Sequence, residues 1–106
     1  MSTLPSEFKR KVADLYLEKK TKLEELDTDT MESFASELLT MIQEEKDSIP
    51  AKHDLEVLES SMKILKNQAM KLKWFEPETD AYDFTLNDCK NLVESTKRWL
   101  KLEGLL

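Results

Sequence analysis

Apolar residues recur every three or four positions along most of this 106-residue chain, which is the spacing of an amphipathic α-helix. Four segments carry the pattern, and short polar or proline-containing stretches separate them. The pattern predicts helices over about residues 5–26, 30–47, 53–75 and 86–103. One glycine and three prolines are few turn-forming residues, which favours long helices over strands.

Residues with helix-capping character mark the expected starts of two of these helices. Asp29 followed by Glu32 resembles a capping box, in which each side chain bonds the backbone of the other residue. Thr85, three positions before Asp88, gives a similar signal for the last helix. Gly104 is placed to end that helix, because glycine adopts the left-handed conformation common at helix C-termini.

The expected fold class is all-α. Short connections make consecutive helices antiparallel, so we predict an antiparallel four-helix bundle as one domain over residues 1–106. The third helix also resembles a coiled-coil seam, but facing pairs such as Ser61 with Lys66 supply no opposite charges to set a parallel partner. Two alternatives stay open: a homo-oligomeric coiled coil, and a bundle completed by a partner chain.

Charge and cysteine content bear on the compartment and the partners. A net charge of −6, with 36% charged residues, indicates an acidic, soluble protein without general attraction to nucleic acid or anionic lipid. Cys89 is the only cysteine, which excludes an internal disulfide and fits a reducing compartment. The sequence shows neither a signal peptide nor a run of about 20 apolar residues. We therefore expect an intracellular protein, cytoplasmic or nuclear, that does not span a membrane.

The residue types that most catalytic sites need are sparse. His53 is the only histidine, so neither a di-iron bundle site nor an ordinary zinc site can be assembled. Cys89 lies on the apolar stripe of its helix and is expected in the core, where it would not react. Gly104 is almost the last residue, so there is no glycine-rich phosphate loop. We expect no enzymatic activity, no cofactor and no metal.

A basic segment supports one alternative function. Between residues 60 and 75 the chain contains four lysines and no acid, namely Lys63, Lys66, Lys71 and Lys73. They could bind an anion, and the alternative hypothesis is a nucleic-acid-associated helical protein that uses segment 63–73. However, the acidic second helix would neutralise them, and no aromatic residues are interleaved with the lysines.

Two apolar features favour a protein partner instead. The stretch "WFEPETDAYDF" between the third and fourth helices contains Trp74, Phe75, Tyr82 and Phe84. These rings either cap the open end of the bundle or remain exposed as a binding hot spot.

The second feature is a pair of apolar residues, Val57 and Ile64, on the back of the third helix, one heptad apart and away from the core stripe. They suggest a surface that another helix covers. The leading hypothesis is a non-catalytic protein–protein interaction module, a small subunit or adaptor of a larger assembly, that binds through the aromatic linker and this back face.

Overall fold

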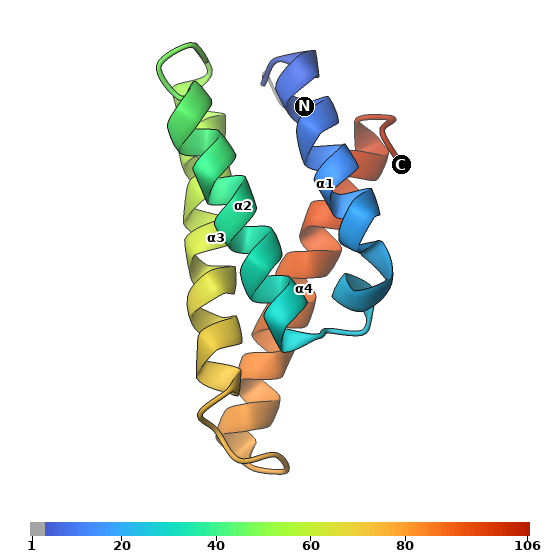
Figure 1. Cartoon of the computed structure of the whole chain (residues 1–106), viewed down its shortest axis with the longest axis vertical. Coiled ribbons are helices and arrows are strands. Elements are labelled where there is room, and N and C mark those ends of the chain that lie inside the picture. Colours follow the sequence, from blue (N-terminus) through green and yellow to red (C-terminus); the bar gives the residue numbers. More distant parts are fainter. Residues whose placement is uncertain (1–3) are drawn as a thin grey trace.

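The computed structural model describes residues 4–106, and this part of the chain folds into four α-helices (Figure 1). The helices are α1 (Ser6–Glu24), α2 (Thr28–Glu45), α3 (Lys52–Leu72) and α4 (Asp80–Leu102). Each packs against its sequence neighbour, and α1 also contacts α4, which closes the ring. The direction alternates from one helix to the next, so the predicted all-α, antiparallel four-helix bundle is confirmed.

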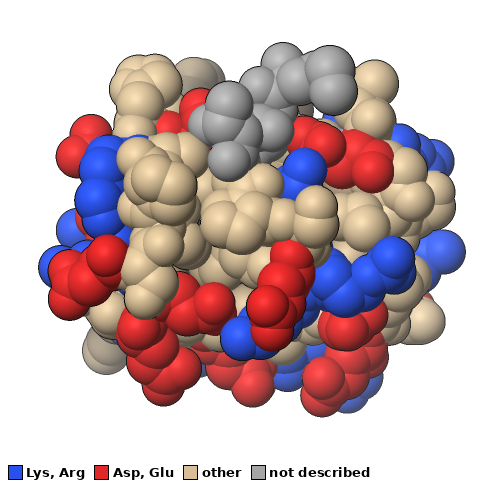
Figure 2. All heavy atoms as spheres, turned by 90° about the horizontal axis from the view of Figure 1, so that it is seen from above, with Lys and Arg blue, Asp and Glu red and all other residues tan. Residues whose placement is uncertain are grey.

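The bundle is elongated, measuring 43 × 24 × 20 Å. Helices α2 and α3 form a long hairpin with the most extensive helix–helix contact, and α4 runs obliquely to them (Figure 1). The first and last described residues lie at the same end of the molecule (Figure 1). Viewed from that end, acidic and basic side chains are interspersed around uncharged areas, and neither sign forms a continuous patch (Figure 2).

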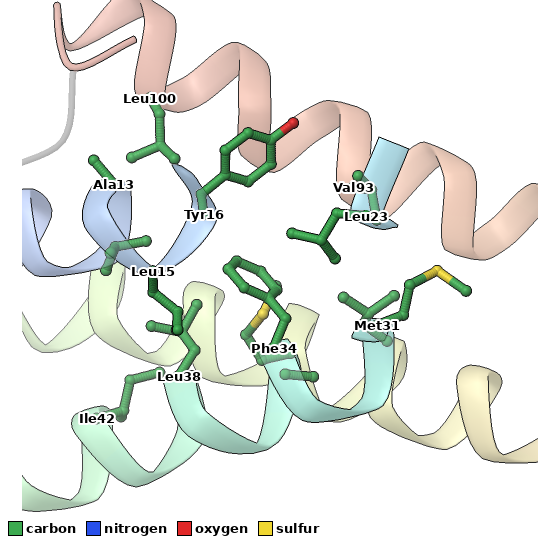
Figure 3. Close-up of a cluster of buried hydrophobic side chains, with 14 of the residues drawn as sticks. Ala13, Leu15, Tyr16, Leu23, Met31, Phe34, Leu38, Ile42, Val93 and Leu100 are labelled. Carbon is green, nitrogen blue, oxygen red and sulfur yellow. The ribbon is translucent and has the colours of Figure 1, made fainter. Parts of the chain in front are cut away.

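The core takes side chains from all four helices, because each helix turns its apolar stripe inward (Figure 3). The predicted stripes are largely confirmed. Fully or nearly fully buried members are Phe8, Val12, Tyr16, Leu23, Met31, Phe34, Leu38, Ile42, Leu55, Met62, Leu65, Ala69, Leu72, Cys89, Val93 and Leu100. Burial of each large aliphatic or aromatic side chain contributes about 1.5–3 kcal/mol.

Helix α2 begins two residues earlier than the capping-box pattern indicates. Its N-cap is Asp27, whose carboxylate accepts hydrogen bonds from the backbone N–H and the hydroxyl of Thr30, at 3.0 and 2.6 Å. Asp29 therefore lies inside the first turn, where its negative charge interacts favourably with the positive end of the helix dipole. The prediction of Asp29 as the cap is wrong, because Asp27 offers the same side-chain chemistry two residues closer to the preceding helix.

Helix α4 begins at Asp80 rather than near Leu86. The N-cap is Thr79, whose hydroxyl accepts from the Tyr82 N–H at 3.2 Å and donates to the Glu76 carbonyl at 2.7 Å. Thr85, the predicted cap, is instead buried within the helix. Residues 80–85 are thus helical, and the connection between α3 and α4 is shorter than predicted.

The C-terminus of α4 is capped as predicted. Gly104 adopts a φ of 74° and donates its N–H to the Lys101 carbonyl at 3.0 Å. The next N–H, from Leu105, bonds to the Leu100 carbonyl at 2.9 Å, which completes a Schellman motif.

Candidate partner-binding face on α3 and α4

Large apolar side chains exposed to solvent gather on α3 and α4. Val57 and Ile64 are 53% and 51% exposed, and they lie on one side of α3 because seven residues make about two turns. On α4, Phe84 is 75% exposed and Leu102 is also exposed. The predicted exposure of Val57 and Ile64 on the back of the third helix is confirmed.

The aromatic residues of the quoted stretch do not form one linker cluster. Trp74, just beyond α3, is 84% exposed, while Phe75 beside it is half-buried. Tyr82 and Phe84 belong to α4, where Tyr82 packs against the core and Phe84 points outward. The structure therefore corrects the predicted binding linker: its four rings are divided between core packing and separate exposed positions.

A groove of about 550 Å³ opens between the N-terminal half of α3 and the C-terminal half of α4. Its walls are mainly apolar, and they include Val57, Leu58, Ser61, Leu92, Trp99 and Leu102. Further along the two helices the Gln68 amide donates to the Asp88 carboxylate at 2.9 Å, and this bond joins α3 to α4 beyond the groove.

The groove exists because the facing side chains in its middle are short. The bond between Gln68 and Asp88 puts these residues at one level, so Ser61 and Ser95 face each other seven residues further along the antiparallel helices. Their side chains cannot fill the space between the two backbones. The walls Leu58, Leu92 and Trp99 consequently remain half-buried.

Leu58 and Leu92 follow the apolar spacing of their helices, so the periodicity alone gives no sign of the groove. A small residue on each of two facing helices, Ser61 and Ser95, is the signal that could have indicated it. That signal depends on knowing the helix register, which only the folded chain supplies.

We define the α3–α4 face as the groove and the exposed residues beside it. On α3 it comprises Val57, Ser61, Ile64 and Gln68, and on α4 it comprises Phe84, Asn91, Ser95, Trp99 and Leu102. These nine side chains are uncharged, whereas Asp54 and Glu103, which also line the groove, lie at the start of α3 and just past the end of α4. Depletion of charge beside exposed apolar and aromatic residues is typical of the centre of a protein interface.

Charges along α4 itself are segregated. Residues 80–88 contain three acids and no base, whereas residues 90–101 contain four bases and one acid. This order complements the helix dipole, and it also gives the two ends of α4 opposite potentials.

The lysines of segment 63–73 are partly neutralised by neighbouring acids. Lys73 forms ion pairs with Glu32 and Asp29 of α2 at 2.6 and 2.9 Å. Their hydrogen bonds raise the pKa of Lys73 to about 12. Lys63 lies 3.6 Å from Glu59 on its own helix. The acidic second helix thus offsets positive charge on the third, as the charge pattern predicts.

Lys66 and Lys71 complete the basic segment. Lys66 is half-buried beside α2 residues, among them Ser36 and Glu44, and Lys71 is exposed. The four lysines therefore do not present one exposed basic surface.

Cys89 and His53 carry the one thiol and the one imidazole of the sequence. Cys89 is fully buried, as predicted, and burial, with a smaller contribution from the nearby Asp88 charge, raises the pKa of its thiol to about 11. His53 is exposed in the first turn of α3. Within residues 4–106, no three His, Cys, Asp or Glu side chains are grouped so as to hold a metal ion. Nor does any helix in this range have the length and apolar character needed to cross a bilayer.

No protein-family model, curated protein or solved structure matches this chain.

Proposed function

We propose that this chain is a non-catalytic protein-interaction module that binds another protein through its α3–α4 face. The observation that supports it is the apolar groove of about 550 Å³, flanked by exposed Val57 and Ile64 and free of charge at its centre. An exposed apolar surface does not improve the solubility of a highly charged protein, whereas the core of a protein interface requires such a surface.

The face has the parts of a helix-binding groove. Trp99 lies in the wall, and aromatic residues of this kind frequently carry most of the binding energy of an interface. Val57 and Ile64 are spaced so that a partner helix laid along α3 would contact both. Ser61 and Ser95 add hydroxyl groups that can bond to polar atoms of the partner.

Such a module would act as a small subunit or adaptor of an intracellular assembly, in the cytoplasm or the nucleus. The single buried thiol of Cys89 fits this setting, because the protein needs no disulfide for stability. The alternative, nucleic-acid association through segment 63–73, is not favoured, because Lys73 and Lys63 already have acidic partners.

The test is co-purification from the native cell with the wild-type chain and two matched variants. Ile64→Asp places a charge on the α3–α4 face, and Leu17→Asp places the same charge at a position of similar exposure on α1, 48% against 51%. We expect Ile64→Asp to lose the bound protein and Leu17→Asp to keep it. Equal retention by both variants would contradict the proposal.

Measuring the association at a series of salt concentrations distinguishes protein binding from nucleic-acid binding. Binding at an uncharged apolar face should change little with salt, whereas lysine contacts to phosphates weaken steeply as salt rises. If joint replacement of Lys63, Lys66, Lys71 and Lys73 by glutamate abolished the association while Ile64→Asp did not, the nucleic-acid hypothesis would replace this one.

A further inference from the structure

Building on the proposed function, we infer that Leu4 is an internal plug, which fills one end of the groove between α3 and α4 until a bound partner displaces it. Leu4 lies two residues before the start of α1, yet its side chain is only 5% exposed. It lines the groove together with residues of α3 and α4, among them Leu58 and Trp99. The groove thus already holds one aliphatic side chain of the kind that a partner would insert.

The place of Leu4 in the groove follows from the directions of the helices. Helices α1 and α3 begin at the same end of the bundle, where α4 ends (Figure 1). An ion pair between Lys9 and Glu103, at 3.0 Å, joins the start of α1 to the end of α4. Asp54 and Glu103 line the groove at this end, whereas Ser61 lies about two turns further along α3. Leu4 therefore closes the groove at the end of the bundle and leaves the part beside Ser61 open.

Leu4 can leave the groove without unfolding α1. The helix begins at Ser6, and the Lys9 N–H bonds to the Pro5 carbonyl at 3.0 Å, so rotation of the backbone at Leu4 keeps this bond. Exposing one leucine side chain lowers the affinity for a partner roughly tenfold to hundredfold. A partner that buries an equivalent side chain in the same place offsets this loss, so the plug selects for partners that reach the end of the groove.

The Lys9–Glu103 ion pair holds the start of α1 beside the groove. Its side chains are 13% and 9% exposed, compared with 48% and 28% for the pair that Lys11 forms with Glu45 of α2. Solvent and salt therefore screen the Lys9–Glu103 pair less. Because Glu103 is also part of the groove wall, loss of the Lys9 charge should loosen the contact that keeps Leu4 in place.

The first test measures the affinity of Nile red, a neutral apolar dye whose fluorescence rises in apolar surroundings. Leu4→Ala should bind the dye about tenfold more tightly than the wild type, because it empties one end of the groove. Ile49→Ala truncates a side chain that is 3% exposed and does not line the groove, so it should leave the affinity unchanged. Circular dichroism checks that both variants are folded. Equal affinities for Leu4→Ala and the wild type would overturn the inference.

The second test asks whether the plug moves. Leu4→Cys places a thiol at the plug position, and the rate of its reaction with iodoacetamide reports its exposure. If the dye displaces the plug, saturating Nile red should speed this reaction severalfold. A fixed groove wall would instead be covered by the dye, so a slower or unchanged reaction contradicts the displacement. The native Cys89 is buried and serves as an unreactive background.

The third test concerns the ion pair, in the Leu4→Cys background and without dye. Adding Lys9→Met should speed the reaction at position 4, because the start of α1 is held less firmly. Lys11→Met is the matched control, since it removes an ion pair to α2 from the same helix, and it should leave the rate unchanged. Equal rates in the two variants would show that the Lys9–Glu103 pair does not hold the plug.

These outcomes separate the plug from the proposed function. If Nile red slows the reaction at position 4 while Ile64→Asp still loses a cellular protein, the plug is wrong and the interaction module stands. If the dye speeds the reaction but Ile64→Asp and Leu17→Asp retain the cellular protein equally, the plug is supported and the proposed function fails.

Discussion

The ring of Tyr16 meets the ring of Phe34 edge-on, with centroids 6.2 Å apart and planes at 82° (Figure 3). This contact joins α1 to α2 in the centre of the core and contributes about 0.5–1.5 kcal/mol beyond the area it buries. The Tyr16 hydroxyl, in contrast, is buried without a hydrogen-bond partner among the described residues. The ring stabilises the fold, and the hydroxyl opposes it.

Replacement of that hydroxyl should therefore stabilise the protein. Tyr16→Phe keeps the ring contact with Phe34 and removes a buried polar group whose desolvation costs about 1–3 kcal/mol. We expect the free energy of unfolding to rise by about 1 kcal/mol in urea denaturation. Tyr82→Phe, at a half-buried position, should change it by less than about 0.5 kcal/mol. A loss of stability in Tyr16→Phe would show that the hydroxyl has a bound partner, such as an ordered water.

Stability should fall at alkaline pH in two overlapping steps. Burial raises the pKa of Cys89 from 9.0 to about 11, and burial with the Glu24 charge raises that of Tyr16 from 10.0 to about 12. Above each ordinary value the unfolded chain releases a proton that the folded chain still holds, so rising pH favours unfolding. The loss begins near pH 9 and is complete only above the raised values.

The measurement is the urea midpoint at a series of pH values from neutrality upward. Tyr16→Phe removes the tyrosine contribution, so its decline above pH 10 should be shallower than that of the wild type. Identical slopes for the two proteins would mean that the Tyr16 pKa is not raised by folding.

Leu65 should be among the most costly core positions to truncate. It is fully buried in α3, and Leu65→Ala should lower the free energy of unfolding by about 2–5 kcal/mol, because it leaves a cavity. The adjacent Ile64→Ala, at a half-exposed position on the same helix, is the matched control and should change stability much less. A loss below about 0.5 kcal/mol for Leu65→Ala would mean that the α3 core stripe is misassigned.

Removing the cap of α4 should destabilise the protein moderately. Thr79→Ala deletes the hydroxyl that accepts from the Tyr82 N–H, and the expected loss is about 1 kcal/mol. Thr79→Ser retains the hydroxyl and should lose little. If both substitutions cost the same amount, the methyl group of Thr79 and not its hydrogen bond would be responsible. Thermal or urea unfolding followed by circular dichroism measures both.

The fold could be predicted from the sequence because periodic burial in a bundle is a local signal. Leu65, for example, can be recognised as a core residue from the apolar residues three and four positions away, whichever helix it packs against. The start of α4 could not be chosen in the same way. Thr79 and Thr85 both have capping chemistry, and the choice depends on Tyr82 packing against the core, which is a tertiary contact.

The candidate site was predicted only in part. Val57 and Ile64 were identified because they break the core periodicity of α3. The groove was missed because its volume depends on the oblique path of α4 and on two serines, Ser61 and Ser95, brought face to face by the register. Crossing angle and register between helices are set by packing of the whole core, and no local stretch of sequence specifies them.

The closure of the helix ring has a consequence for the order of folding. Helices α2 and α3 are joined by residues 46–51 alone, so their pairing needs little loop closure. The contact of α1 with α4 must instead bring together distant segments, as the Lys9–Glu103 and Lys97–Glu24 ion pairs at 3.0 and 2.9 Å show. Since non-local contacts form late, we expect the α2–α3 hairpin to assemble first and α1 to detach first on partial opening. Such an opened chain would leave Phe34 without its aromatic partner and turn part of the core towards water.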